Sequence, residues 1–209
     1  MTHLMIFTVC VSLFAGEIKL VHLPSPDMQG GKPLMQALKA RRTRRSFSPK
    51  PLSRQQLSDL LWAAVGVNRA DTGGRTAPTA RNWREIDVYA ALQDGLYLYD
   101  AERNLLTQIL DKDLRGETGR QAFVADAPVN LIYVADLDKM KGASDADKAF
   151  YAATDTGFAA QNVYLFCASE GLATVVRGAL DKEALAKAMG LPKSRKVILA
   201  QTVGMPGKE

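Results

Sequence analysis

"SDADKAFYAATDTGFAAQNVYLFCASEG", residues 144–171, predicts one long helix, and this helix decides the fold class. Ser144 and Asp147 form a capping-box pattern at its start, and Gly171 is the kind of residue at which helices commonly end. Apolar side chains recur along it at helical spacing. Its many alanine and glycine residues suit close helix packing.

Strand and helix patterns alternate on both sides of this helix. The run "VNLIYVA", residues 129–135, is typical of a strand buried on both faces. The expected order is a helix at 33–42, a helix at 53–66, strands at 85–92, 96–100 and 104–110, a short helix at 119–125, the strand at 129–135, the long helix, a strand at 172–178, a helix at 181–190 and a strand at 196–204. This order predicts an α+β protein with a mostly antiparallel central sheet flanked by helices.

The N-terminus has the pattern of a targeting segment. Residues 4–15, "LMIFTVCVSLFA", form an apolar run of signal-peptide length, too short to span a bilayer. We therefore expect a signal peptide at residues 1–16 and a single domain at 17–209, without a membrane span in the mature protein. The protein would then be periplasmic or exported. The alternative is a buried N-terminal strand or helix in a cytoplasmic protein.

The basic charge is concentrated in one short segment, "LKARRTRRSFSPKPLS", residues 38–53. The chain has 27 Lys and Arg against 22 Asp and Glu. Without the four arginines of residues 41–45, 23 basic residues nearly balance the 22 acidic ones. A nucleic-acid-binding domain usually spreads its basic residues along a whole face, so we expect a small anionic ligand and no nucleic acid.

The cysteine and histidine residues do not indicate a metal site, a disulfide or a catalytic site. Cys10 and Cys167 lie in apolar stretches without a CxxC pair, and His3 and His22 lie outside the expected core. This pattern favours neither a zinc site nor a disulfide framework. We predict no metal site and no catalytic side chain, and the common nucleotide-binding, hydrolase and metalloprotease motifs are absent from the sequence.

Geometry suggests how the arginines bind. On a helix, Arg41 and Arg45 lie one turn apart and converge, Arg42 points elsewhere, and Thr43 offers a hydroxyl group nearby. Two guanidinium groups and a hydroxyl suit the oxygens of a phosphate monoester. The alternatives are a solvated basic helix end or a general polyanion patch.

Residues 68–83, "NRADTGGRTAPTARNW", have neither helical nor strand periodicity and predict a long loop. Long loops inside compact domains are usually functional. Its stretch "APTARNW" contains a proline, small residues and Asn82, and it can lie against a planar heterocycle. The alternative is an ordinary surface loop.

Five blocks of the sequence together resemble the nitroreductase superfamily of FMN-dependent flavoproteins. The likeness covers roughly residues 33–207, and the stretch "DGLYLYDAERNLL" is closer to the branch of the SagB-type dehydrogenases, which oxidise azolines in peptides. The blocks are "ARRTRRSFSPKPLSRQQLSDLLWAA", "RTAPTARNWREIDVYAAL", "QAFVADAPVNLIYVAD", "DTGFAAQNVYLFCASEGLATVVRGALD" and "VILAQTVGMPG".

The resemblance implies a nitroreductase-like fold, an intertwined homodimer, and one FMN in each of two interface sites. It assigns the FMN phosphate to the segment that carries Arg41, Arg42, Thr43 and Arg45, with Arg41 and Arg45 as the main ligands. Two further segments would contact the flavin. They are the loop of Pro78, Thr79, Ala80, Arg81 and Asn82, acting across the interface, and the strand end at Val176, Arg177 and Gly178.

The resemblance also implies a reaction. NAD(P)H would reduce FMN in a ping-pong cycle, and a nitroaromatic, quinone or related small acceptor would reoxidise it. Arg81, Arg84 or Arg177 would stabilise the reduced flavin. The sequence departs from the family pattern at three points. Arg84 stands where the family often has Gln, and Lys208 is the one candidate for the family's basic tail. The Lys-Tyr pair of azoline dehydrogenases cannot be located in the sequence. The alternatives are a SagB-like flavin dehydrogenase and a non-enzymatic flavin-binding protein.

Overall fold

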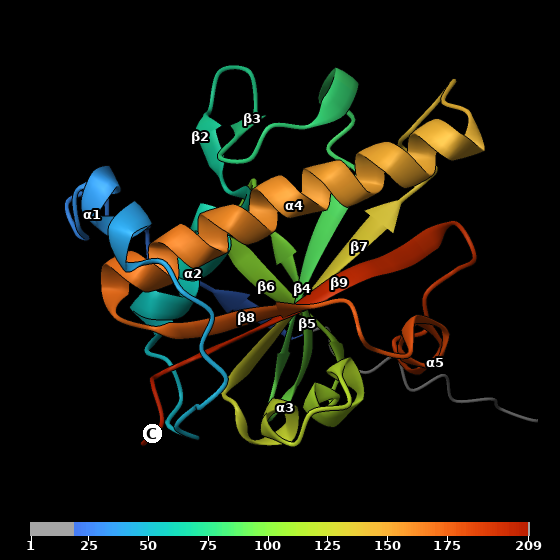
Figure 1. The fold of residues 1–209 in the computed structure, drawn as a ribbon. Helices are drawn as coiled ribbons and strands as arrows, with labels where there is room; N and C mark the ends of the chain where they lie inside the picture. The colour runs from blue at the N-terminus through green and yellow to red at the C-terminus, as the bar shows by residue number, and fades with distance from the viewer. Residues whose placement is uncertain (1–18, 209) are drawn as a thin grey trace, which may run out of the picture.

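A computed structural model describes residues 19–208, which form a seven-stranded sheet with helices on both faces (Figure 1). The sheet order is β1-β6-β5-β4-β7-β9-β8, and every neighbouring pair in it is antiparallel. The predicted α+β class is confirmed. The strands are β1 (Leu20–His22), β4 (Ile86–Leu92), β5 (Gly95–Asp100), β6 (Leu105–Leu110), β7 (Val129–Asp136), β8 (Ala173–Arg177) and β9 (Arg195–Gly204).

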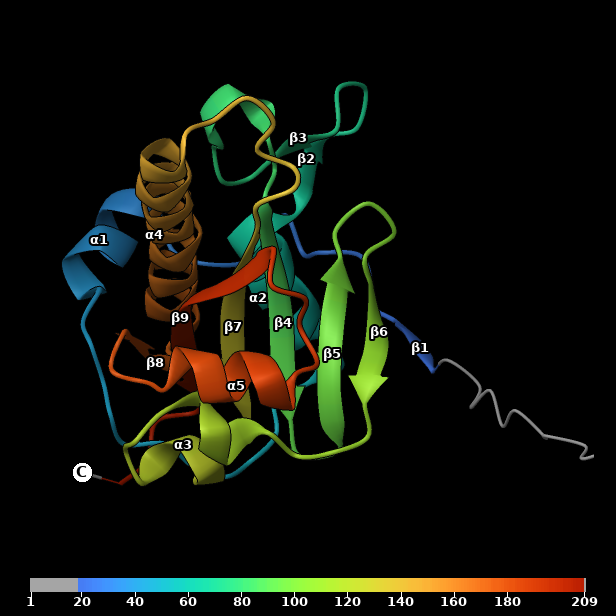
Figure 2. The same cartoon turned by 90° about the vertical axis from the view of Figure 1, so that its right-hand side faces the viewer.

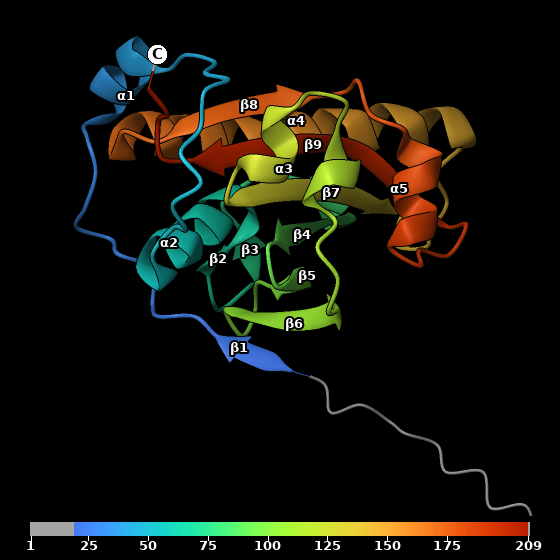
Figure 3. The same cartoon turned by 90° about the horizontal axis from the view of Figure 1, so that it is seen from below.

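Strand β7 lies inside the sheet between β4 and β9, and all eight of its residues are buried, as its apolar run predicts. Helices α2 (Arg54–Val65) and α4 (Asp145–Glu170) pack on one face of the sheet. Helix α5 (Lys182–Ala188) packs on the other (Figures 2 and 3). Two apolar cores result, one on each side of the sheet, because strand side chains alternate between its faces.

Helix α4 begins and ends as predicted. The Ser144 hydroxyl accepts a hydrogen bond from the Asp147 N–H at 3.1 Å, and Gly171 ends the helix with φ 72°. The left-handed conformation at this position favours glycine. Ala152 and Ala159 are buried against the sheet, so the small residues do allow the close approach expected of them.

Two segments in the N-terminal half of the chain differ from their predicted structure. Helix α1 (Leu34–Ala40) ends two residues earlier than expected. The segment predicted as an unstructured loop at 68–83 contains part of a short hairpin, β2 (Val67–Arg69) with β3 (Gly74–Arg75), and a 3₁₀ turn, η1 (Ala80–Asn82). Strands of two and three residues are too short to show a period of two, which is why the sequence hides them.

Two further differences lie elsewhere. The helix expected at 119–125 is displaced, and the chain forms η2 (Arg115–Thr118) and α3 (Phe123–Asp126) instead. Strand β1 is an additional edge strand paired with β6.

The predicted signal peptide at 1–16, with Cys10 and His3, lies outside the described residues. No helix within residues 19–208 combines the length and apolar character needed to cross a bilayer.

Replacing Ser53 should test the predicted start of α2. The Ser53 hydroxyl accepts from the Gln56 N–H at 3.1 Å, and the Gln56 side chain accepts from the Ser53 N–H at 3.0 Å. S53A should lower the free energy of unfolding by about 1 kcal/mol in urea denaturation, because it leaves a helix N–H without its partner. S53T keeps the hydroxyl and should lose about 0.5 kcal/mol or less. Equal losses in both variants would contradict the cap.

Candidate functional site

The basic segment after α1 is extended and not helical. Arg41 has φ −56° and ψ 120°, which lies outside the helical region. The Arg44 N–H donates to the Thr174 carbonyl of β8 at 3.0 Å. The predicted convergence of Arg41 and Arg45 on a helix is therefore wrong, because the backbone pairs with the edge of the sheet and the helix does not continue.

The extended backbone still separates the arginines into two sets, since alternate side chains point to opposite sides. Arg41 and Thr43 face α4. Arg42 and Arg44 line a small pocket beside the C-terminal end of α4. If the segment stays fully extended, the same alternation puts Arg45 on the side of Arg41 and Thr43.

Tyr164 of α4 joins the basic segment to the sheet. Its hydroxyl lies 3.0 Å from Thr43 Oγ1 and accepts a hydrogen bond from the Val176 N–H at 3.1 Å. The Arg41 guanidinium lies 5.5 Å from the centre of its ring, within the range of a cation–π contact. The sequence marks Tyr164 only as one position on a helical face, and no local signal reveals this role.

The C-terminal segment runs beside the basic segment (Figure 1). The Ser48 N–H donates to the Met205 carbonyl at 2.9 Å, and Ser46 Oγ donates to the Lys208 carbonyl at 3.0 Å. A Cβ added at Gly207 would lie 2.5 Å from Ser46 Oγ, so this close approach requires glycine. These contacts place Lys208 at the same edge of the molecule as the arginines.

The loop after the β2–β3 hairpin has a strained backbone. Arg81, Asn82 and Arg84 have φ values of 49°, 55° and 51°. Non-glycine residues adopt this left-handed region at a cost, and such strain persists where the surroundings enforce it. Here Thr79 Oγ1 accepts from the Arg84 N–H at 3.2 Å, and Asn82 Oδ1 accepts from Arg84 Nε at 3.0 Å. Pro78, at the start of the loop, is exposed.

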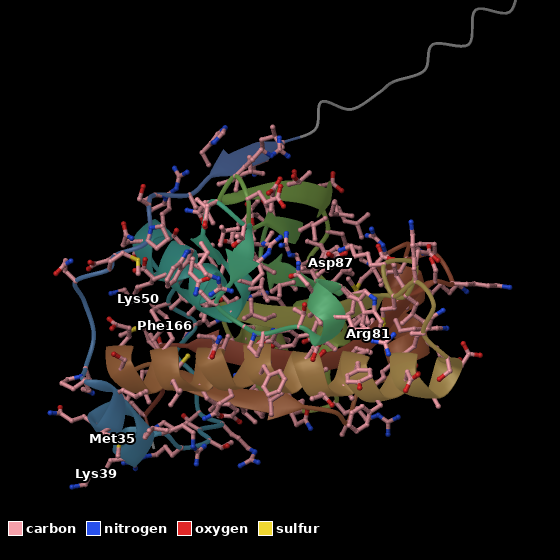
Figure 4. The ribbon with its side chains drawn as sticks, turned by 90° about the horizontal axis from the view of Figure 1, so that it is seen from above. Met35, Lys39, Lys50, Arg81, Asp87 and Phe166 are labelled. Atoms are coloured by element: carbon pink, nitrogen blue, oxygen red, sulfur yellow. The ribbon has the colours of Figure 1, made fainter. Side chains whose placement is uncertain are left out.

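The same loop is anchored on the N-terminal half of α4. The Ala80 N–H donates to Asp155 Oδ2 at 2.8 Å. The rings of Trp83 and Tyr151 pack edge to face with centres 5.8 Å apart. The Arg81 guanidinium lies 5.3 Å from the centre of the Trp83 ring, and Figure 4 shows Arg81 beside this half of the helix. The loop is therefore fixed to α4 by a backbone hydrogen bond and an aromatic contact.

Arg177 of β8 is buried, and its side chain points away from α4 into the protein. The guanidinium donates to the Thr118 carbonyl, to Asn130 Oδ1 at 2.8 Å and to Thr202 Oγ1 at 2.9 Å. Burial lowers the pKa of Arg177 to about 10, so it is still a cation at neutral pH. Because the guanidinium is held in this network, its side chain is not placed to stabilise charge on a ligand outside.

The neighbouring β8 positions can offer backbone groups. Val176 is half-buried, and its N–H already donates to Tyr164. Gly178, directly after the strand, is exposed. A Cβ added there would meet only Leu199, at 3.6 Å, so the backbone can be approached closely at this point.

Cys167 and His22 are the cysteine and the histidine that lie within the described residues. Cys167 is buried, and burial raises the pKa of its thiol well above the ordinary value, as expected of an inert packed side chain. His22 is exposed on β1, outside the core. Within residues 19–208, no group of three or more His, Cys, Asp or Glu is arranged to hold a metal ion.

Comparison with known proteins decides the family. The model described as the Nitroreductase family matches residues 38–205. The chain belongs to the nitroreductase family.

Individual members of the family show how similar this nitroreductase-family chain is to known proteins. A protein of Methanocaldococcus jannaschii, provisionally named a nitroreductase, is 34% identical over 165 residues, covering 74% of this chain and 82% of the relative. A crystal structure of a provisionally named nitroreductase from Ralstonia eutropha has 44% identity and a TM-score of 0.87, covering 91% of this chain and 90% of that chain. The NADPH:FMN oxidoreductase of Vibrio harveyi shares the fold at 22% identity and a TM-score of 0.63, covering 84% and 69%.

The two polar segments of this nitroreductase-family chain do not meet within one protomer. The loop is anchored at Asp155 and the basic segment at Tyr164, nine residues further along α4. A helix rises 1.5 Å per residue, so the anchors are about 13 Å apart. In Figure 4, Arg81 lies beside one half of α4, and Met35 and Lys39 of α1, the helix directly before the basic segment, lie beside the other end. The two candidate segments therefore contact α4 at separate positions along the helix.

Replacing Arg177 should distinguish a structural role from a ligand-binding role. R177M should lower the free energy of unfolding by about 2–4 kcal/mol, because it leaves buried acceptors on Asn130 and Thr202 without their charged donor. The exposed Arg120 is the control, and R120M should change stability by less than about 0.5 kcal/mol. Urea denaturation monitored by circular dichroism measures both. An R177M protein as stable as the wild type would contradict the network.

Proposed function

We propose that the protein is a homodimeric, FMN-dependent NAD(P)H oxidoreductase that reduces a small acceptor such as a nitroaromatic compound or a quinone. Membership of the nitroreductase family makes it an oxidoreductase by class. The observation that carries the FMN proposal is that Arg41 and Thr43 of the basic segment both contact Tyr164 of α4, with the exposed Arg45 two residues further along.

The basic segment fits a phosphate monoester. Guanidinium groups bind phosphate oxygens through paired, charge-assisted hydrogen bonds, and a hydroxyl can complete the set. Arg45 and Thr43 are exposed, and Arg41 is partly exposed, so all three are accessible to a ligand. Lys208 adds a further cation at the same edge. The FMN phosphate is held by Arg41, Thr43 and Arg45, with Lys208 nearby.

A second copy of the chain completes each site. The loop of residues 78–82 lies about 13 Å along α4 from the basic segment of its own protomer. In a dimer with a two-fold axis near the middle of α4, the partner's loop lies at the basic segment of the first protomer. By the same symmetry, the loop of the first protomer lies at the basic segment of the partner. Asn82 then donates and accepts hydrogen bonds at the polar edge of the flavin.

The outer face of α1 and α4 supports this dimer. Leu34, Met35 and Leu38 of α1 are exposed, with 74% of Met35 accessible, and Phe150 and Phe158 of α4 are exposed at 62% and 43%. Ala37 of α1 is buried, but no residue between 19 and 208 covers the side chains of Leu34, Met35 and Leu38. Large apolar side chains gathered on adjacent helices are typical of a protein–protein interface.

The side chains of this chain bind and orient, and none of them needs to act as an acid or base. FMN, when bound, supplies the two-electron chemistry that links a nicotinamide to an acceptor. Arg81 and Arg84 provide positive charge on the loop, where they stabilise negative charge at the pyrimidine edge of a bound flavin. The Arg177 side chain takes no part, because it is held inside the protein.

Two measurements test this proposal. The purified protein should be yellow, or become so on addition of FMN, and anaerobic addition of NADH or NADPH should bleach the flavin absorbance. A colourless protein that takes up no FMN would overturn the proposal. A yellow protein that neither nicotinamide bleaches would overturn the NAD(P)H part alone.

Single replacements in the basic segment should show which of its arginines contribute to FMN binding. R41A and R45A should each weaken FMN binding by about 1.5–3 kcal/mol, which is roughly a tenfold to hundredfold rise in Kd, because each removes a charge-assisted hydrogen bond. R42A should change Kd less than about threefold, since Arg42 lines the opposite pocket. Fluorescence quenching of FMN measures all three. Equal losses in the three variants would indicate a diffuse basic patch.

A charge placed on the outer face of α4 should break the dimer. F158E should give a monomer in analytical ultracentrifugation and should weaken FMN binding at least about tenfold, because each site loses the partner's loop. Ile109 of β6 is a matched control, since it is 40% exposed against 43% for Phe158 but lies near the opposite edge of the sheet. I109E should remain a dimer. A dimeric F158E would place the interface elsewhere.

A further inference from the structure

Two carboxyl groups are buried together beneath the loop of residues 78–84. Glu85, directly before β4, is fully buried, and neither of its carboxyl oxygens accepts a hydrogen bond from any residue between 19 and 208. Asp155, in the middle of α4, is 3% exposed, and its Oδ2 accepts from the Ala80 N–H at 2.8 Å. The residue types alone do not predict this pair, because 70 positions of sequence separate them.

A buried carboxylate without a hydrogen-bond donor is disfavoured in its ionised form, and a second carboxyl group nearby disfavours it further. Burial raises the pKa of Glu85 from 4.5 to about 7; the backbone amide of Glu85 opposes this rise, the neighbouring Asp155 adds to it, and Lys139 opposes it more weakly. The Lys139 ammonium lies 2.7 Å from Asp87 and is already paired there. A protonated Glu85 can donate a hydrogen bond to the neighbouring Asp155, whose Oδ2 accepts from the Ala80 N–H.

The other charged groups around Glu85 have partners of their own. In the loop, Arg84 donates to Asn82 Oδ1 and to the Thr72 carbonyl. The Asp136 N–H at the end of β7 donates to the Glu85 carbonyl at 2.8 Å, while the Asp136 carboxylate pairs with a cation of β9.

Beyond the loop, Arg75 of β3 lies 3.7 Å from Glu102. Asp155 and Glu102 both line a cavity of about 340 Å³, and Glu102 is 69% exposed at its edge. This opening gives the carboxyl pair a route for exchanging its proton with solvent.

We propose that the shared proton of Glu85 and Asp155 positions the flavin-contacting loop, holding it against α4 when Glu85 is protonated and releasing it when both carboxyls are ionised. Ala80 is the residue directly before Arg81 and Asn82, whose backbones are strained. Its N–H bond to Asp155 is therefore placed to maintain that strain. When Glu85 loses its proton, repulsion moves the Asp155 carboxylate away and the anchor weakens. The effect on FMN rests on the proposed function, whereas the effect on the loop does not.

The direction of the pH effect follows from proton linkage. The raised pKa means that the folded protein binds a proton that the unfolded chain releases near its ordinary value of 4.5. The stabilisation from this group is therefore complete below 4.5 and is lost as the pH rises through about 7. The loop should be ordered at pH 6 and should loosen towards pH 8.5.

Hydrogen exchange of the FMN-free protein tests the loop directly. Protection factors at the Ala80 amide, corrected for the intrinsic pH dependence of exchange, should fall by up to about tenfold per pH unit above neutrality. E85Q is the matched variant, because its neutral amide donates to Asp155 at every pH, and its Ala80 protection should not change between pH 6 and 8.5. The Ala184 amide, which donates to the Asp181 carboxylate of α5 at 2.9 Å, is the internal control and should stay constant in both proteins.

The outcomes separate this inference from the proposed function. In titrations with FMN, wild-type Kd should rise several-fold from pH 6 to 8.5, and Kd of E85Q should stay constant. A wild-type protein with constant Ala80 protection over this range overturns the inference, whether or not E85Q folds. The inference is also overturned if the Ala80 amide loses protection in parallel in wild type and E85Q as the pH rises. Loss of protection in a protein that binds no FMN would support the carboxyl pair and overturn the proposed function.

Discussion

The packing of α4 across one face of the sheet is the constraint on which both halves of the candidate site depend. Buried alanines bring this helix close to the strands, and the same helix carries Asp155 and Tyr164. Asp155 anchors the loop before β4, and Tyr164 anchors the basic segment and the Val176 N–H. The spacing between the half-sites is therefore set by helical rise alone, which makes it rigid.

Each half-site is ordered before any ligand arrives. The basic segment is held between the edge of β8 and the C-terminal segment, and the loop keeps three left-handed residues through hydrogen bonds to its own side chains and to α4. A preorganised site loses less conformational entropy when it binds. Contacts within the chain therefore position both segments.

The arginine segment has a different backbone geometry from the predicted one, while the grouping of Arg41 with Arg45 stays a prediction. The sequence grouped Arg41 with Arg45 because helical residues four apart share a face, yet the chain is extended there. Positions four apart also share a side in an extended chain, where the period is two. In an extended chain Thr43 also shares that side, and the structure shows both Thr43 and Arg41 in contact with Tyr164.

The sequence by itself determined the local elements and the chemical types available. Capping residues and periodicity were sufficient for α2, α4 and β7, because the interactions that form them lie within one segment. Only the tertiary structure decided what the charged side chains do. It placed Arg177 in a buried network, joined Tyr164 to Thr43, and brought Glu85 against Asp155. The physical reason is that burial and long-range contacts set the environment of a charge, and neither is encoded in its neighbours along the chain.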